Sequence, residues 1–363
     1  MGELKRFIDI YVPVTSCNLQ CHYCYISDSK RRGREAEKLQ FSPEQFRYAL
    51  RKERLGGECL FNMCGWGETM LLPEITDYVR ELLEEGHYIW IVTNGLVTAA
   101  FDKMMELPAE LKSRLGFKFS FHYLELKRID QMDRFWDNVK KVRENGCSIT
   151  VEVTANDELV PYKKELAEES LKNAGALPHI TVVRNGALWE VPLLSKLSEQ
   201  EFYDTWKEFN SDMLDNKMKV WGQKRKEYCY AGMWSGLLNM ATGEFRSCYS
   251  TALRYDDILS NPDKPIPFVP IGTHCKCSHC FNSHAFLALG TIPEMDFCTY
   301  REIRDRECED GSHWVSPEMA DFIGQKFSDN NKQLSSGKKF LLNLRYHLIT
   351  KSRKLKRKLK GLK

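Results

Sequence analysis

The sequence lacks several features that would place it in other classes of protein. Among its 363 residues no apolar run reaches the about 18 residues of a membrane-spanning helix. The N-terminus has neither the apolar stretch nor the small-residue cleavage site of a signal peptide, so a cytoplasmic protein is expected. No repeat with a period of roughly 20–50 residues occurs, which excludes a solenoid.

Acidic residues are missing from one end of the chain. The last 29 residues, 335–363, hold 11 Lys and Arg and no Asp or Glu, whereas the rest holds 42 basic and 50 acidic side chains. The net charge of +3 therefore combines an acidic body with a basic C-terminal segment.

Four apolar residues recur at helical spacing in this segment: Phe340, Leu341, Leu344 and Leu348. The pattern predicts an amphipathic basic helix, which is suited to peripheral contact with an anionic membrane, such as the inner face of the cell membrane. A solvated extension is the alternative. Nucleic acid is not expected as a partner, because no base-stacking module accompanies the basic residues.

Cysteine, by contrast, is abundant. The chain holds 13 cysteines, and in a protein expected inside the cell they indicate metal ligation or redox chemistry rather than a disulfide framework. Apolar residues make up 42% of the chain, enough to fill a sizeable core. The composition therefore predicts a folded protein with a cofactor.

From residue 7 to about 183, short apolar or β-branched runs alternate with longer segments of helical periodicity. Strands are expected at 8–14, 59–64, 88–93, 117–122, 148–154 and 179–183, with helices such as 42–55, 73–85 and 134–144 between them. This alternation predicts an α/β fold, a partial (β/α)6 barrel of the TIM type. Beyond about residue 221 cysteine, glycine and proline cluster without periodicity, so three parts are expected: 1–220, 221–334 and 335–363.

Three cysteines follow the first expected strand in the sequence CNLQCHYC, at Cys17, Cys21 and Cys24. They would lie on a loop at the C-terminal end of a strand, where barrel enzymes place their chemistry. Three thiolates can hold three corners of a [4Fe–4S] cluster and leave the fourth iron open to a small molecule. The alternative is zinc, with His22 or a distant residue as fourth ligand, in a zinc-stabilised binding module.

The motif resembles the CX3CX2C signature of the radical S-adenosylmethionine (SAM) superfamily, with the aromatic Tyr23 before the last cysteine. The resemblance implies an enzyme in which Cys17, Cys21 and Cys24 hold a [4Fe–4S] cluster whose open iron binds SAM. It further implies reductive cleavage of SAM to a 5′-deoxyadenosyl radical that abstracts hydrogen from a substrate. An external donor such as flavodoxin or ferredoxin would supply the electron.

Further motifs occur in the order that this superfamily requires. Gly65-Trp66-Gly67-Glu68 resembles the Gly-Gly-Glu motif that contacts the amino group of SAM, although the inserted Trp66 makes Gly67-Glu68 the better match. The resemblance also implies cofactor contacts from polar residues near the strand ends: Thr93, Asn94, Ser120, His122, Glu152, Thr154 and Arg184. A simple turn, solvated strand residues and a surface arginine are the alternatives. Cys64, beside the motif glycines, is a candidate hydrogen donor.

A second cysteine group lies in the part 221–334. Cys229 and Cys248 precede the sequence CKCSHC at 275–280. The arrangement resembles the auxiliary-cluster region of radical SAM enzymes, and because the CX5CX3C block of the fuller SPASM form is missing, the shorter twitch form with one [4Fe–4S] cluster fits better. The resemblance implies as ligands Cys229, Cys248, Cys277 and Cys280, with Cys275 as an alternative to Cys277. A zinc ribbon is the alternative for this region.

A single auxiliary cluster resembles the arrangement in enzymes that modify hydroxyl-bearing cyclitols and sugars. The resemblance therefore implies oxidation or epimerisation of a polar small molecule, such as a sugar, polyol or cyclitol. The alternative is a maturase that modifies a ribosomally made peptide. Such enzymes often carry an N-terminal peptide-recognition domain, and 16 residues precede Cys17 here.

Overall fold

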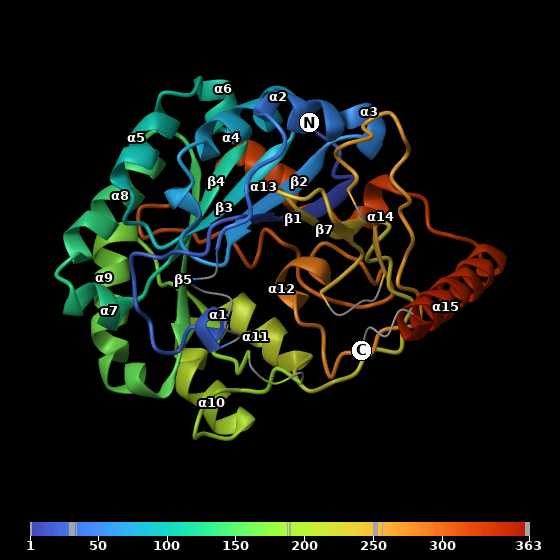
Figure 1. Cartoon of the computed structure of the whole chain (residues 1–363). Helices are drawn as coiled ribbons and strands as arrows, with labels where there is room; N and C mark the ends of the chain where they lie inside the picture. Colours follow the sequence, from blue (N-terminus) through green and yellow to red (C-terminus); the bar gives the residue numbers. More distant parts are fainter. Residues whose placement is uncertain are drawn as a thin grey trace.

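The computed structural model describes residues 2–28, 33, 35–186, 188, 190–249, 253–255 and 257–359. In these residues the chain forms a nine-stranded sheet in the order β6-β5-β4-β3-β2-β1-β7-β8-β9 (Figure 1). The first six strands pair in parallel and in chain order: β1 (Arg6–Val12), β2 (Cys59–Gly65), β3 (Tyr88–Thr93), β4 (Leu115–Ser120), β5 (Ser148–Ala155) and β6 (His179–Val182). The predicted α/β fold with a partial (β/α)6 barrel is confirmed.

Helical elements connect the strands, and all but the first of them cover the outer face of this sheet (Figure 1). They are α1 (Tyr25–Asp28), α2 (Pro43–Ala49), α3 (Lys52–Leu55), η1 (Thr69–Leu71), α4 (Ile75–Glu84), α5 (Thr98–Met105), α6 (Ala109–Lys112), α7 (Tyr123–Arg128), α8 (Met132–Glu144), η2 (Asp157–Tyr162) and α9 (Lys163–Ala174). Ser42 begins α2 through a reciprocal cap with Gln45, and Pro43 occupies the first turn. The single helix predicted at 42–55 is two helices, because the backbone of Arg51 is extended where its guanidinium reaches the carbonyl of Pro262.

The two faces of the sheet carry different cores, because side chains alternate along each strand. Residues such as Ile10, Phe61 and Ile91 face the helices. On the inner face Phe7, Leu60 and Trp90 pack instead against the C-terminal third of the chain. Gly116 makes room there, since a Cβ on it would lie 2.7 Å from the indole ring of Trp90.

Residues after β6 fill the inner face and extend the sheet. They form α10 (Glu199–Trp206), η3 (Lys207–Phe209), α11 (Asp212–Lys219), β7 (Ser235–Asn239), β8 (Phe245–Arg246), β9 (Arg254–Tyr255), α12 (Ser283–Phe286), α13 (Pro317–Ile323) and α14 (Phe327–Asn330). Strand β7 pairs in parallel with β1, and β8 and β9 continue antiparallel. The predicted second part therefore begins with strands that share the sheet of the barrel.

The predicted basic helix is α15 (Ser336–Leu359), which lies at the edge of the molecule, away from the sheet (Figure 1). The last four residues of the predicted segment, 360–363, lie outside the described residues. In the described part of the chain, no helix combines the length and the apolar character needed to cross a membrane.

Candidate functional site

The first cysteine group lies on the loop between β1 and α1. The amide of Cys24 donates to the carbonyl of Cys21 at 3.2 Å, which folds the loop into a turn. Burial, followed by the neighbouring charges of Glu125, Cys17 and Cys24, raises the pKa of the Cys21 thiol to about 12. The three thiols are therefore close enough to oppose one another's ionisation, and a positively charged group such as an iron cluster would favour their thiolate forms.

The loop at 65–68 packs against the cysteine loop. The amide of Glu68 donates to the carbonyl of Ser16 at 2.8 Å. A Cβ on Gly67 would lie 1.8 Å from that same carbonyl oxygen, so a side chain at this position would displace the backbone before Cys17. Gly67 thus has a structural reason to be glycine whether or not it contacts a cofactor.

The buried carboxylate of Glu68 joins the ends of β2 and β3. It accepts hydrogen bonds from the hydroxyl of Thr93 at 2.7 Å and from the amides of Asn94 at 2.7 Å and Met70 at 3.0 Å. The side-chain nitrogen Nδ2 of Asn94 in turn lies 3.7 Å from Cys17 Sγ. Glu68, Thr93 and Asn94 are therefore brought together with the cysteine loop, and they fix its position.

Tyr23 ties the cysteine loop to the end of β4. Its hydroxyl lies 2.8 Å from Nδ1 of His122. Burial lowers the pKa of His122 to about 4, so the imidazole is neutral at pH 7. The sequence pattern predicted Ser120 and His122 on one strand face, but β4 ends at Ser120, since the amide of His122 donates back to the carbonyl of Ser120 and the chain turns into α7.

Glu152, Thr154 and Arg184 lie farther along the sheet. Glu152 forms an ion pair with the buried Arg304, a residue of the C-terminal part, whereas Thr154 faces Thr181 of the next strand. The guanidinium of Arg184 lies over the ring of Tyr25 and donates to the carbonyl of Phe281.

Arg184 is thus placed between the two cysteine groups. Tyr25 directly follows Cys24, and Phe281 directly follows Cys280. The distance from the guanidinium carbon to the Tyr25 ring centre is 4.5 Å, and that from Nη1 to the Phe281 carbonyl oxygen is 3.2 Å. The alternative of a free surface arginine does not fit these contacts.

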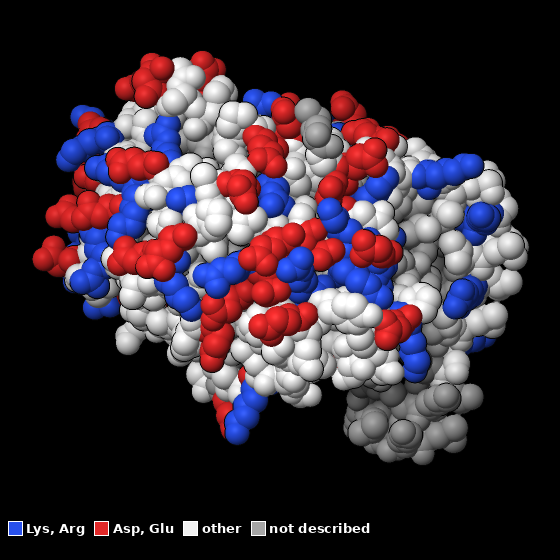
Figure 2. Space-filling model, turned by 90° about the horizontal axis from the view of Figure 1, so that it is seen from above, with Lys and Arg blue, Asp and Glu red and all other residues white. Residues whose placement is uncertain are grey.

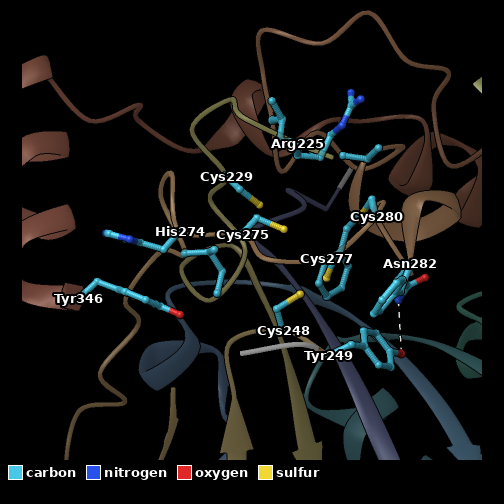
Figure 3. Close-up of a pocket in the computed structure, with 15 residues that line it drawn as sticks. Arg225, Cys229, Cys248, Tyr249, His274, Cys275, Cys277, Cys280, Asn282 and Tyr346 are labelled. Carbon is cyan, nitrogen blue, oxygen red and sulfur yellow. Dashed lines mark hydrogen bonds between the residues drawn. The ribbon is translucent and has the colours of Figure 1, made fainter. Parts of the chain in front are cut away.

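The second cysteine group lines one cavity of about 40 Å³. Five cysteines take part, from the loops before β7, after β8 and before α12: Cys229, Cys248, Cys275, Cys277 and Cys280. In Figure 3 the sulfur atoms of Cys229, Cys248 and Cys275 face the same space. Segments that lie up to about fifty residues apart in the chain therefore converge on one site.

The thiols of this cavity influence one another. Burial, followed by the charges of Cys248 and Cys275, raises the pKa of Cys280 to about 12. The pKa of Cys229 is also raised, first by burial and then by the charges of Cys248, Cys280 and Cys275. A hydrogen bond from Cys277 lowers the pKa of Cys275 to about 6, so Cys275 favours the thiolate form that binds metal.

Residues 11–162 match the family model described as the radical SAM superfamily. These residues form a radical SAM domain. The search of curated protein sequences gave no match. The use of SAM and a [4Fe–4S] cluster follows from this domain.

Solved structures share the fold of this radical SAM protein. Streptococcus suis SuiB bound to S-adenosylmethionine aligns with 13% identity over 74% of this chain and 67% of that chain, with a TM-score of 0.50. The enzyme anSMEcpe with bound AdoMet and Kp18Cys peptide aligns with 14% identity over 72% of this chain and 78% of that chain, also with a TM-score of 0.50. At these identities the likeness is one of fold.

The observed donors fit the expected cofactors of a radical SAM protein. The three N-terminal thiols stand beside a glycine that leaves no room for a side chain. His22, the alternative zinc ligand, is exposed and pairs with Glu158 at 3.2 Å. Among the described residues, no three His, Cys, Asp or Glu side chains form a group of the kind that holds a single metal ion.

Sequence reasoning missed a chain of buried polar side chains inside the barrel. Its buried members are Asp9, Asn62, Lys118, Tyr300 and Arg304, and Tyr249, which is 44% exposed, bonds to Asp9. Asp9, Asn62 and Lys118 interrupt otherwise apolar strands on the inner face, and this interruption is the signal that could have found them. Tyr249, Tyr300 and Arg304 come from loops without periodicity, and their sequence offers no comparable signal.

Proposed function

We propose that this radical SAM enzyme binds a polar small molecule, such as a sugar, polyol or cyclitol, inside its barrel and oxidises or epimerises it. The observation that carries this proposal is the chain of buried polar side chains inside the barrel, which Asp9 joins to Tyr249 at the second cysteine cavity. When bound, SAM with its [4Fe–4S] cluster would supply abstraction of a substrate hydrogen, and the cysteines of the second cavity would hold a cluster able to accept an electron.

The proposed substrate-binding groups are held by one another. Asn62 Nδ2 donates to Asp9 Oδ1 at 2.6 Å, and Lys118 Nζ donates to Asn62 Oδ1 at the same distance. Lys118 also donates to the hydroxyl of Tyr300 at 2.6 Å. Burying such groups is costly unless they are paired, and a site built from them disfavours apolar ligands. These side chains offer both donors and acceptors for a hydroxyl-bearing substrate.

Cys64 is proposed to return a hydrogen atom to the substrate, and the thiyl radical left on Cys64 would then take one electron from the external donor and one proton from water. Its Sγ lies 3.5 Å from Asp9 Oδ1. Burial raises the pKa of this thiol well above its ordinary value, and the Asp9 carboxylate adds to the effect. Cys64 therefore keeps its S–H bond at neutral pH, as a hydrogen-atom donor must. Asp9 also bonds to Tyr249, which lines the second cavity and links it to this site.

For the cofactors we propose Cys17, Cys21 and Cys24 as ligands of the SAM-binding cluster. Cys229, Cys248 and Cys280 are proposed for the auxiliary cluster, and the mutual effects on pKa favour Cys275 over Cys277 as their fourth partner. Gly65, Gly67, Ser120, His122 and Thr154 remain proposed neighbours of SAM, and Glu68, Thr93, Asn94, Glu152 and Arg184 are proposed to position the loops around it. A flavodoxin or ferredoxin in the cytoplasm is the proposed electron donor.

The test is substrate-dependent formation of 5′-deoxyadenosine with dithionite, using a panel of sugars, polyols and cyclitols. A stimulating compound is expected, and Asn62→Leu should abolish the stimulation while the slow substrate-free cleavage of SAM continues. Met63→Leu is the matched control, because Met63 is the neighbouring residue on the outer face of β2. Equal stimulation of both variants would contradict a substrate site at Asn62.

The same assay in D2O separates the two outcomes of the reaction. Epimerisation through Cys64 introduces one solvent-derived deuterium, because a thiol proton exchanges with water. Oxidation gives a product that lacks two hydrogens and gains no deuterium. If Cys64 donates hydrogen, Cys64→Ala should form 5′-deoxyadenosine but no epimerised product; unchanged product from this variant would remove Cys64 from the mechanism.

A second candidate function is modification of a peptide. It is favoured by the shared fold of anSMEcpe, whose structure holds both AdoMet and a peptide. Stimulation of 5′-deoxyadenosine formation by a peptide encoded beside this gene, together with no response to any sugar, polyol or cyclitol, would replace the first proposal by this one.

A further inference from the structure

Helix α15 is held against the body of the protein by one of its faces. Tyr346 is buried and stacks on His274, with ring centres 4.6 Å apart and planes 7° apart. The side-chain oxygen of Asn343 accepts from the amide of Thr273 at 3.3 Å, and Lys339 pairs with Glu294 at 3.1 Å. The position of this helix is therefore fixed by the loop that also carries Cys275.

The opposite face of α15 is apolar and exposed. Four large side chains lie on it with these exposed fractions: Phe340 69%, Leu341 63%, Leu344 49% and Leu348 58%. Leu341, Leu344 and Leu348 follow Phe340 by one, four and eight positions, a spacing that places all four side chains in a single stripe along the helix. Other exposed large apolar residues of the described chain, such as Leu188 and Tyr48, come singly from separate segments. A contiguous exposed stripe of this kind marks a binding surface.

The charge of the same segment defines its partner. Residues 335–363 hold 11 basic and no acidic side chains, and Lys338 and Arg345 are exposed beside the apolar stripe. On the left and middle of the face in Figure 2, by contrast, acidic and basic side chains are interspersed. A partner for α15 must therefore offer an apolar layer under a dense negative charge. A second copy of this helix would bring nine further basic residues close to those of the first, which is unfavourable.

We propose that α15 docks on an anionic lipid surface. Phe340, Leu341, Leu344 and Leu348 enter the boundary between headgroups and acyl chains, and the exposed Lys338 and Arg345 contact the lipid phosphates. Because α15 is fixed to the loop 272–275, docking also places the second cysteine cavity close to the membrane. This inference does not depend on the proposed substrate or reaction.

The test uses the full chain and vesicles of phosphatidylcholine with and without phosphatidylglycerol. The protein is expected to sediment with the anionic vesicles, to remain in solution with the neutral ones, and to be released as the salt concentration rises. Leu344→Ser combined with Leu348→Ser should weaken binding at least about tenfold. Leu188→Ser is the matched control, because Leu188 is 50% exposed, close to the 49% of Leu344, and lies elsewhere.

Equal sedimentation with neutral and anionic vesicles, or equal binding by the double variant and the parent chain, would overturn the proposal. So would a dimer, seen by analytical ultracentrifugation without lipid, that the double variant abolishes, because the stripe would then bind a second copy. Since all substituted residues are exposed, the variants should melt at the same temperature as the parent. A lowered melting temperature of the double variant alone would show that the stripe stabilises the fold instead.

Discussion

The two cysteine groups of this protein are assembled in opposite ways. The first comes from eight consecutive residues on one loop, whereas the second is gathered from three loops between Cys229 and Cys280. The first offers three thiols and the second offers five. A short motif can thus specify an open cluster locally, while a closed cluster requires the tertiary fold to choose four ligands from a larger set.

The largest expected effect distinguishes the two cysteine groups by their role in SAM cleavage. Cys17→Ala should reduce 5′-deoxyadenosine formation to background, because SAM needs the cluster that this loop is proposed to hold. Iron content should fall from about eight to about four per chain, with the second cluster kept. Cys147→Ala, which changes a buried cysteine on the outer side of the barrel, serves as the control and should retain both iron and activity. Loss of all iron from Cys17→Ala would mean that the two groups are not independent.

The next effect concerns the choice within the second group. Cys275→Ala should remove about four iron per chain and leave the first cluster in place, whereas Cys277→Ala should keep both clusters. The reason is that the pKa of Cys275 is lowered to about 6, which favours its thiolate form, and that Cys275 is among the thiols that raise the pKa of Cys229 and Cys280. Iron analysis after anaerobic purification measures both variants, and the reverse result would return the ligand role to Cys277.

A smaller effect tests the support of the first group. Gly67→Ala should lower stability by about 2 kcal/mol and reduce occupancy of the first cluster only, because the new Cβ meets the carbonyl of Ser16. Gly337→Ala is the control, since nothing lies within 4 Å of an added Cβ there. Thermal melting and iron content are the measurements. If Gly67→Ala matches the control in both, the contact between the two loops is not required.

The smallest expected effect is the pH dependence of stability through His122, which contacts Tyr23 of the first cysteine loop. The pKa of His122 is lowered to about 4 in the fold, against an ordinary value of 6.5, so the unfolded state binds the proton more readily between these values. Stability should therefore be complete above about pH 6.5 and fall as the pH decreases, by about 1 kcal/mol at pH 5.5. His122→Gln removes the titrating group, so the melting temperature of this variant should depend less on pH over this range. An equally steep loss in the variant would assign the effect to other groups.

Residue patterns predicted the bounds of the six parallel strands to within two residues, and they placed the first cysteine group on the loop after the first strand. Both predictions depend on local alternation and spacing. The pattern at Ser120 and His122 was less reliable, since a strand end depends on where the next helix begins. Asp9, Asn62 and Lys118 were visible as polar residues in apolar strands, but nothing local shows that they bond to one another. Their partners Tyr249 and Tyr300 lie more than a hundred residues away in the chain.

The sequence by itself determined that this protein contains a radical SAM domain, a cysteine-rich part and a basic helix, because periodicity, motif spacing and charge are properties of neighbouring residues. Only the tertiary structure decided that Arg184 lies between the two cysteine groups, that five cysteines share one cavity, and that one stripe of α15 is left exposed. These are contacts between distant segments, and their free energies depend on burial and geometry that no local pattern records.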